Sequence, residues 1–371
     1  MVKLSGSRKK FILRVFVVLI ACAFLATSLA PSIGHSGTST NTKSMYDLHS
    51  NPLVSGNSNP SSAGHLKYTL VLSNNTLING NFVNTANGIA PYDATFDSRN
   101  GYVYVTDYYS DSVSVINGAT NKVIDTIPVG SAPQGISYDP INGYVYVANS
   151  NSNNVSVING ATNTVIDNIG IGLYRFGSHP IRSHPVGISY DSSNGYLYVT
   201  NSIPNRVSVI NGATNKIIDT IAVGFYPQGI SYDSSNGYLY VTNSASDSVS
   251  VINGATNKVI DNIAVGSGPL GISYDSSNGY VYVANSKSNN VSVINGATNT
   301  VIGTIPVGSG PEGMAFDPDN GYVYVANFNS GTISIIATTT KTTSSTELYA
   351  IIGAVAAIVV IIGVIFVIRR R

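Results

Sequence analysis

Aromatic and basic side chains, which bind ligands through broad rigid surfaces and planar hydrogen bonds, gather at three places in this sequence. Two of these places are the pairs Tyr108–Tyr109 and Phe225–Tyr226. Between them lies a segment of mixed aromatic, Arg and His residues, a composition that would also suit stacking on sugar rings. We predict a ligand-binding set made of Tyr108, Tyr109, Tyr174, Arg175, Phe176, His179, Arg182, His184, Phe225 and Tyr226. The alternative is that these residues only pack a loop onto its neighbours.

Side chains for other kinds of chemistry are scarce. His179 and His184 supply two possible metal ligands with no third beside them, so we predict no metal site and no cofactor. The sequence has no nucleophile elbow, zinc-binding motif or phosphate-binding loop. We therefore predict that the protein is not an enzyme. The alternative is an extracellular lyase or hydrolase whose residues come from several repeats and meet at a central channel.

A tandem repeat must position these residues. The string Gly-Tyr-Val/Leu-Tyr-Val occurs six times, at intervals of 42, 52, 42, 42 and 42 residues. The copies begin at Gly101, Gly143, Gly195, Gly237, Gly279 and Gly321. An insertion of ten residues, at about Arg175 to His184, explains the longer interval.

Each copy predicts four short strands. In the second copy they are residues 135–138, 144–149, 155–158 and 165–169, which are rich in Val, Ile and Tyr and alternate with a period of two. Four strands in about 40 residues is the size of one propeller blade. Residues 67–337 therefore predict an all-β, six-bladed β-propeller of 42-residue, four-stranded repeats, with seven blades as the alternative.

Turn residues between the strands are nearly constant. An Asp ends the first strand of every copy, and an Asn-Gly pair precedes the second, as in Asp191 and Asn194-Gly195. Such a carboxylate accepts a backbone N–H two residues on, and Asn-Gly tolerates positive φ. We predict structural turns here and not calcium sites, because the spacing differs from that of a calcium-binding loop.

Strand direction assigns the loops to two faces. The turns that join the first strand to the second and the third to the fourth lie on one face, the constant face, where copies hardly differ. The remaining loops, the crossovers between copies and the insertion lie on the other, the variable face. Constant turns need only to fold, whereas variable loops can recognise a ligand. The variable face is therefore the predicted binding face, and the repeated tyrosines, such as Tyr196 and Tyr198, are predicted to pack between blades.

The sequence resembles the YVTN family of β-propeller repeats over residues 91–336. The resemblance rests on Tyr-Val-Thr-Asn at Tyr198 and Tyr240 and on Tyr-Val-Ala-Asn at Tyr146, Tyr282 and Tyr324. The first copy departs from the pattern, with Tyr-Val-Thr-Asp at Tyr104. Members of that family are typically prokaryotic surface proteins, many of them associated with archaeal surface layers. The resemblance thus implies a propeller outside the cell and no particular activity.

The sixth copy lacks a fourth strand, since residues 332–336 are followed by Thr- and Ser-rich sequence. Two candidate strands, residues 68–72 and 76–83, precede the first copy. We predict that one of them completes the last blade, because this removes an open sheet edge. The register is left open by the sequence.

Both ends of the chain predict a single-pass membrane protein. Residues 1–30 resemble a signal peptide or signal-anchor, and the polar residues 31–66 are predicted to be a disordered linker. A Thr/Ser stalk at 338–347 leads to the uncharged segment 348–368, which is long enough for a transmembrane helix. The arginines at 369–371 predict a cytoplasmic tail, and therefore an extracellular propeller.

Charge argues against one class of partner. Eight of the 19 Lys and Arg residues lie in the first 14 or last three residues, which leaves 11 basic against 18 acidic residues elsewhere. A mildly acidic middle without a basic stripe predicts no binding to nucleic acid. Sequons for N-glycosylation occur at Asn74, Asn154 and Asn290.

These patterns predict a cell-surface protein for recognition or adhesion that binds a glycan or an envelope protein through its variable face. The alternative from a different class is a structural envelope or surface-layer component without a discrete ligand.

Overall fold

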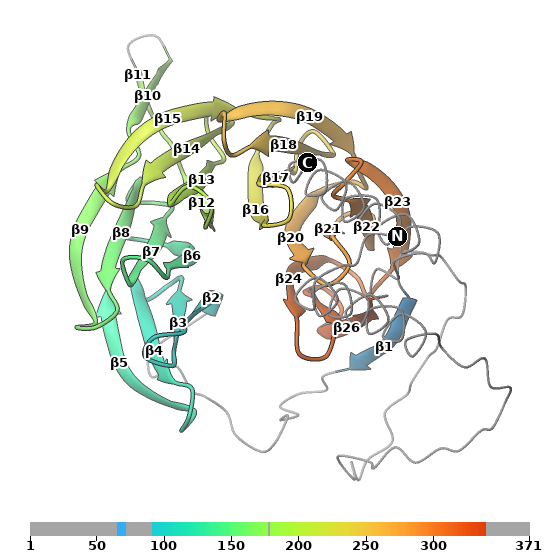
Figure 1. Ribbon diagram of the computed structural model, residues 1–371, viewed down its shortest axis with the longest axis horizontal. Coiled ribbons are helices and arrows are strands. Elements are labelled where there is room, and N and C mark those ends of the chain that lie inside the picture. Colours follow the sequence, from blue (N-terminus) through green and yellow to red (C-terminus); the bar gives the residue numbers. More distant parts are fainter. Residues whose placement is uncertain (1–64, 72–90, 177–178, 339–371) are drawn as a thin grey trace, which may run out of the picture. The chain divides into compact units, whose positions relative to one another are not determined.

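A computed structural model describes residues 65–71, 91–176 and 179–338. Every regular element in these ranges is a β-strand, and six antiparallel sheets of four strands follow one another as the blades of a six-bladed β-propeller (Figure 1). The repeat thus predicted the fold correctly. None of the described residues belongs to a helix that could span a membrane. The predicted signal and the predicted transmembrane helix at 348–368 lie outside the described residues.

The first three blades match the repeats in chain order. Blade 1 contains β2 (Pro91–Asp97), β3 (Tyr102–Asp107), β4 (Ser112–Asn117) and β5 (Lys122–Pro128). Blade 2 contains β6 (Pro133–Asp139), β7 (Tyr144–Asn149), β8 (Asn154–Asn159) and β9 (Thr164–Gly170). Blade 3 contains β12 (Pro185–Asp191), β13 (Tyr196–Asn201), β14 (Arg206–Asn211) and β15 (Lys216–Ala222). The strands of the second repeat were therefore predicted within one or two residues at each end.

The next two blades repeat this arrangement. Blade 4 contains β16 (Pro227–Asp233), β17 (Tyr238–Asn243), β18 (Ser248–Asn253) and β19 (Lys258–Ala264). Blade 5 contains β20 (Pro269–Asp275), β21 (Tyr280–Asn285), β22 (Asn290–Asn295) and β23 (Thr300–Pro306). In each blade the first strand is innermost and the fourth is outermost (Figure 1).

Blade 6 is built from both ends of the propeller sequence. It contains β24 (Pro311–Asp317), β25 (Tyr322–Asn327), β26 (Thr332–Ala337) and β1 (His65–Val71). Strand β1 pairs antiparallel with β26, from His65 opposite Ala337 to Val71 opposite Thr332. This confirms that a strand from before the first repeat completes the last blade. The strand begins two residues before the predicted boundary at residue 67, and the other candidate, 76–83, lies outside the described residues.

The turns of the constant face have the predicted chemistry. The Asp191 carboxylate accepts the backbone N–H of Ser193 at 2.8 Å, and the same bond recurs in the other blades at 2.8 to 2.9 Å. The glycine of each Asn-Gly pair has φ between 69° and 78°, a region that favours glycine. These aspartates serve as turn residues.

Apolar packing lies between the blades. Five clusters of buried residues each join one blade to the next, from blades 1 and 2 to blades 5 and 6. The largest buried side chains in them are Tyr104, Tyr146, Tyr198, Tyr240 and Tyr282. The Tyr198 hydroxyl lies 3.0 Å from the Gly254 carbonyl oxygen and 2.8 Å from Asn257 Oδ1, both in the following blade. This confirms that the repeated tyrosines pack between blades.

Glycines on the inner strands allow the blades to approach closely. A Cβ added to Gly187 would lie 2.5 Å from the carbonyl oxygen of Gln228, and one added to Gly229 would lie 2.5 Å from that of Leu270. Real Cβ atoms do not come this near to a backbone oxygen. Blade 1 differs because Asp93 occupies the glycine position, and its Oδ2 accepts the backbone N–H of Ile136 at 3.2 Å.

Candidate binding face

Backbone hydrogen bonds confirm that the loops fall on two faces. On the constant face, the Gly212 N–H donates to the Gly195 carbonyl at 3.1 Å, which joins the two turns of blade 3. On the variable face, the crossover after blade 1 is held from both sides. The Val129 N–H donates to Asp111 of its own blade at 3.0 Å, and the Ser150 N–H of blade 2 donates to Ala132 at 3.0 Å.

Three tyrosines in blade 1, which we call the tyrosine cluster, form a fixed aromatic surface on the variable face. Tyr92 lies at the start of the innermost strand, and Tyr108 and Tyr109 directly follow β3. The rings of Tyr92 and Tyr108 stack with their centroids 6.0 Å apart, and Tyr109 meets Tyr108 edge-on at 5.0 Å. Tyr92 is 56% exposed and Tyr109 is 69% exposed. The cluster therefore offers ordered ring surfaces to solvent.

Most of the exposed aromatic side chains in the described propeller lie on the variable face. They are Tyr92, Phe96, Tyr109, Phe225, Tyr226 and Phe328. All except Phe96 lie in the loops, crossovers or strand ends of the variable face. A soluble domain gains nothing in stability from such exposure, so exposed aromatic residues that share one face suggest a binding surface.

Tyr226 has a backbone conformation that a residue with a bulky side chain does not favour. Its φ is +58°, and the equivalent crossover residues in two other blades are glycines, Gly268 at +63° and Gly310 at +64°. A bulky residue in the left-handed region is strained. The backbone bond at this site, from the Tyr226 N–H to Asn205 Oδ1 at 2.9 Å, needs no aromatic side chain. The ring is 49% exposed, so the crossover does not bury it as a packing residue.

The insertion forms a two-stranded hairpin, where the sequence had predicted a loop. Strand β10 (Leu173–Phe176) pairs antiparallel with β11 (His179–Arg182). The hairpin stands on the outer side of the blades (Figure 1). At its base, Arg182 Nη1 donates to the Asn151 carbonyl at 3.2 Å, and the His184 N–H donates to Asn153 Oδ1 at 3.3 Å. These bonds fix the base of the hairpin to a loop of blade 2.

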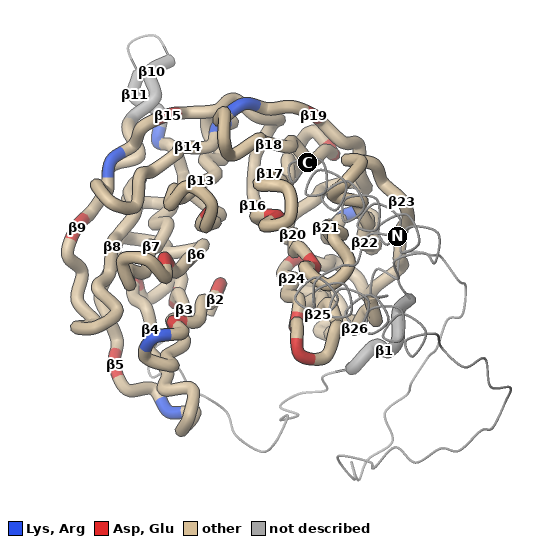
Figure 2. Tube along the Cα trace, viewed as in Figure 1, with Lys and Arg blue, Asp and Glu red and all other residues tan. Residues whose placement is uncertain are grey.

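Two acidic residues, Asp93 and Glu312, lie near Tyr92 of the tyrosine cluster. Burial of the hydroxyl, and then the negative charges of Glu312 and Asp93, raise the pKa of Tyr92, so this phenol stays a neutral hydrogen-bond donor at pH 7. Burial of the carboxylate raises the pKa of Asp93 to about 6, against the lowering effect of backbone bonds from Ala94 and Ile136. The residue as a whole is nevertheless exposed. Solvent therefore screens the charge of Asp93. Figure 2 shows the Lys and Arg residues of the described chain as scattered positions.

The structure places the sequence-predicted residues unevenly. It brings Tyr108 and Tyr109 together, and it leaves Phe225 and Tyr226 exposed in the crossover to blade 4. Arg182 and His184 lie at the base of the hairpin, where packing onto blade 2 accounts for the bonds of both. The backbones of Tyr174, Arg175, Phe176 and His179 lie in the hairpin, and their side chains are outside the described part.

Sequence reasoning missed Tyr92 and Phe328. Both could have been found by comparing copies position by position. Phe328 follows β25 where Ser150, Ser202 and Ser244 follow the equivalent strands, and it is 73% exposed. Tyr92 stands at the second position of an inner strand, where Gln134 and Gln228 stand in other copies.

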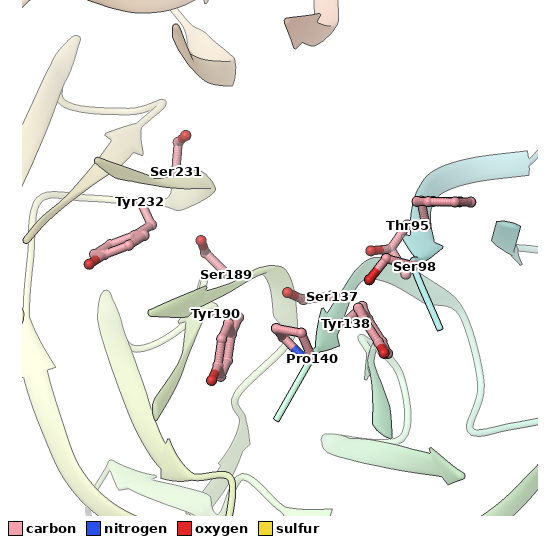
Figure 3. Close-up of a pocket in the computed structure, with 10 residues that line it drawn as sticks. Thr95, Ser98, Ser137, Tyr138, Pro140, Ser189, Tyr190, Ser231 and Tyr232 are labelled. Atoms are coloured by element: carbon pink, nitrogen blue, oxygen red, sulfur yellow. The ribbon is translucent and has the colours of Figure 1, made fainter. Parts of the chain in front are cut away.

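A second feature lies on the inner strands, towards the constant face. A pocket of about 470 Å³ is lined by Thr95, Phe96, Ser98, Ser137, Tyr138, Pro140, Ser189, Tyr190, Ser231 and Tyr232. The serines of successive strands point to one side and the tyrosines to the other (Figure 3). Burial raises the pKa of Tyr138 and Tyr190 to about 12. This lining offers hydroxyl groups for hydrogen bonds, but it does not pair a serine with a base that could activate it.

The two described sequons lie near the variable face, at the starts of β8 and β22, which are the third strands of their blades. Asn154 Oδ1 is 2.9 Å from Asn149 Nδ2, and Asn290 Oδ1 is 2.8 Å from Asn285 Nδ2. Asn74 lies outside the described residues. Among the described side chains, no three His, Cys, Asp or Glu residues gather as a possible metal site.

Comparison with known proteins concerns the fold alone. No protein-family model matches this chain, and no curated protein matches it. Among solved structures, hydrazine synthase from Kuenenia stuttgartiensis is similar, with a TM-score of 0.49 and 16% sequence identity. The match covers 71% of this chain and 100% of that chain. A likeness at this identity says nothing of activity.

Proposed function

We propose that this protein is a membrane-anchored recognition propeller on the cell surface, which binds a glycan through its variable face. The observation that carries the proposal is the placing of exposed aromatic side chains. Five of the six in the described part share this face, and they differ from the residues that fill the same positions in other copies. Folding requires none of them, since those other copies fold without them.

The tyrosine cluster is the centre of the proposed site. Stacked and edge-on rings held 5.0 to 6.0 Å apart present fixed apolar surfaces, and a sugar ring can lie against such a surface through its C–H groups. The neutral Tyr92 hydroxyl and the carboxylates of Asp93 and Glu312 supply partners for sugar hydroxyls. The open form of the face suits a polymer or a branched chain better than a small enclosed ligand.

The location on the cell surface rests on the sequence. The uncharged segment 348–368 and the arginines after it support a membrane anchor with the propeller outside. Protease added to intact cells should then remove the propeller and leave the tail protected. Cleavage that requires lysis of the cells would contradict this part of the proposal.

A glycan array tests the binding with the full chain. Replacing Tyr92 and Tyr109 together by Ala should reduce binding at least tenfold, because each exposed stacking contact contributes about 1 kcal/mol. The matched control is Ile141→Ala, since Ile141 is as exposed as Tyr109, at 69%, but lies on the constant face. Equal binding by both variants would remove the tyrosine cluster from the site. Binding to envelope protein and to no glycan would replace the proposed ligand class.

A further inference from the structure

Blade 1 differs from the other blades by acidic as well as aromatic substitutions on the variable face. Asp93 stands where the other five copies have glycine, and Asp107 stands where they have asparagine. Asp111, which is exposed, stands where three of them have asparagine. The blade with the tyrosine cluster thus also gains negative charge, and the other copies show that a blade folds without either feature.

Glu312 brings a fourth acidic side chain from blade 6. It stands at the second position of β24, where Gln134 and Gln228 stand in blades 2 and 4, and it is exposed. Burial, and then the negative charge of Glu312, raise the pKa of Tyr92, so this carboxylate lies within electrostatic range of the cluster. Negative charge therefore reaches the tyrosine cluster from two blades.

Neutral hydrogen-bond donors hold the acidic side chains of blade 1 in place. Asp93 Oδ2 accepts a backbone N–H of blade 2 at 3.2 Å, and Asp111 Oδ1 accepts one from the first crossover at 2.8 Å. Asp107 is 1% exposed, and its Oδ2 accepts the Ser114 hydroxyl at 2.7 Å. These bonds orient the carboxylates, but because the donors are neutral they do not cancel the negative charge.

The basic residues of the propeller stand apart from this region. Arg99 and Lys122, the two basic residues of blade 1, belong to turns of the constant face. On the variable face the described basic residues are Arg182 of the hairpin, Arg206 of blade 3 and Lys287 of blade 5. The crossover from blade 1 to blade 2 and the loop after β7 contain no charged residue. The potential at the tyrosine cluster is therefore negative, because neighbouring charges of one sign add.

Exposed aromatic rings beside carboxylates are suited to an ammonium group. The face of a tyrosine ring is negative and attracts a cation that lies over it. The stacked rings of Tyr92 and Tyr108 and the edge-on ring of Tyr109 offer such faces in different orientations. A cation at the cluster would also be attracted by the carboxylates, whereas an anionic ligand would be repelled by them. The charges thus distinguish between ligands that the rings alone would bind alike.

We infer that the tyrosine cluster binds the ammonium group of an amino sugar, so that the glycan ligand carries free amines and not N-acetyl or carboxylate groups. This inference rests on the proposed function, because it specifies the sugar that the same site would bind. Asp93, Asp111 and Glu312 supply the opposite charge, and the buried Asp107 acts through its electric field. A lysine side chain would offer the same ammonium group but no flat C–H face for a second ring.

An array of matched ligands tests the ligand class with the full chain. It holds amine-bearing, N-acetylated, uncharged and carboxylated glycans and a lysine-rich peptide, at a pH at which the amines are protonated. The glucosamine hexamer should bind about tenfold more tightly than the N-acetylglucosamine hexamer, and less tightly as added salt screens the charges. Equal affinities, or a preference for carboxylated glycans, would overturn the inference and leave the proposed function standing. Binding of the peptide alone, or of no glycan, would overturn the proposed function itself.

A variant that removes charge and keeps every ring tests the residues. It combines Asp107→Asn, Asp111→Asn and Glu312→Gln, which introduce the residues that other copies hold at these positions. Its affinity for the glucosamine hexamer should fall about tenfold, with no change for an uncharged hexamer. The control removes the same number of charges from the outer strands β9, β15 and β19, by Asp167→Asn, Asp219→Asn and Asp261→Asn.

The two variants together decide whether this site recognises the amine. Unchanged affinity in the test variant, or an equal loss in the control, would overturn the inference, since the hexamer would then respond only to the net charge of the protein. A thermal melt checks the fold of both. If the test variant melts at a lower temperature than the parent, Glu312→Gln alone decides, because Glu312 is exposed and other copies have glutamine there. Unchanged affinity in that single variant would also overturn the inference.

Discussion

The constant and variable faces of the same blades have equally regular backbones and very different side chains. On the constant face the repeated Asp and Asn side chains of the turns form hydrogen bonds, as when Asp191 accepts the Ser193 N–H or Asn194 reaches Gly254 of the next blade. On the variable face the crossovers are held through their own backbone N–H and C=O groups, as in the bond from Ser150 to Ala132 or from the Tyr226 N–H to Asn205 Oδ1. The side chains of crossover residues such as Tyr226 are therefore left free to change while the fold persists.

This difference separates the side chains that the fold requires from the side chains that it does not require. A side chain that bonds the next blade cannot vary, because its loss leaves a buried polar group without a partner. A side chain whose backbone alone is bonded can become aromatic, as Tyr226 has. Four substitutions test this difference between the two faces.

Tyr198→Ala should have the largest effect. It removes a fully buried ring and two hydrogen-bonding contacts to blade 4, and should lower the free energy of unfolding by about 3 to 5 kcal/mol. Tyr109→Ala, on the variable face, should change it by less than about 0.5 kcal/mol. Denaturant unfolding measures both. Similar losses for the two variants would mean that the variable face also belongs to the scaffold.

Gly229→Ala should have the second largest effect. The new Cβ would lie 2.5 Å from the Leu270 carbonyl oxygen and force blades 4 and 5 apart, at a cost of about 1 to 3 kcal/mol. Gly170→Ala is the control, since nothing lies within 4 Å of its added Cβ. Thermal melts compare them.

Tyr226→Gly should separate the two faces most directly. Glycine relieves the positive φ, as at Gly268, and should raise the free energy of unfolding by up to about 1 kcal/mol. The same change removes an exposed ring from the proposed site and should weaken glycan binding. Melting and binding are measured on one preparation. A loss of stability would show that the ring supports the crossover.

Asp93→Asn should have the smallest effect, and one that depends on pH. The pKa of Asp93 is about 6 in the fold against an ordinary value of 3.8, so its stabilising contribution is complete below pH 3.8 and is lost as pH rises through 6. The variant should therefore gain stability relative to the parent at pH 7 and not at pH 3.5. Because the residue is exposed, we expect less than about 1 kcal/mol. Asp125→Asn, which removes one exposed charge from β5, controls for net charge.

Features repeated in every copy could be predicted from the sequence, and unique features could not. Strands, turns, faces and the packing of Tyr198 each follow from local patterns that occur six times. Tyr92 was missed because it differs from the other copies at a single position, where Gln134 and Gln228 stand, and only a position-by-position comparison reveals it. The hairpin of the insertion was missed because eight residues of two short strands give too little alternation to distinguish a strand from a loop. The bond from Arg182 to blade 2, at the base of the hairpin, joins residues far apart in the sequence. The spacing of motifs along the chain does not indicate such a contact.

The pairing of β1 with β26 has a consequence for how the protein is made. His65 leaves the ribosome long before Ala337, which is 272 residues further along the chain. At about 5 to 20 residues per second, the first strand waits for about 15 to 55 seconds before its partner exists. During that time the newly synthesised chain carries an apolar strand with unpaired backbone groups. We therefore expect folding of this protein to depend on a chaperone that shields the nascent segment around β1 until the last blade has been translated.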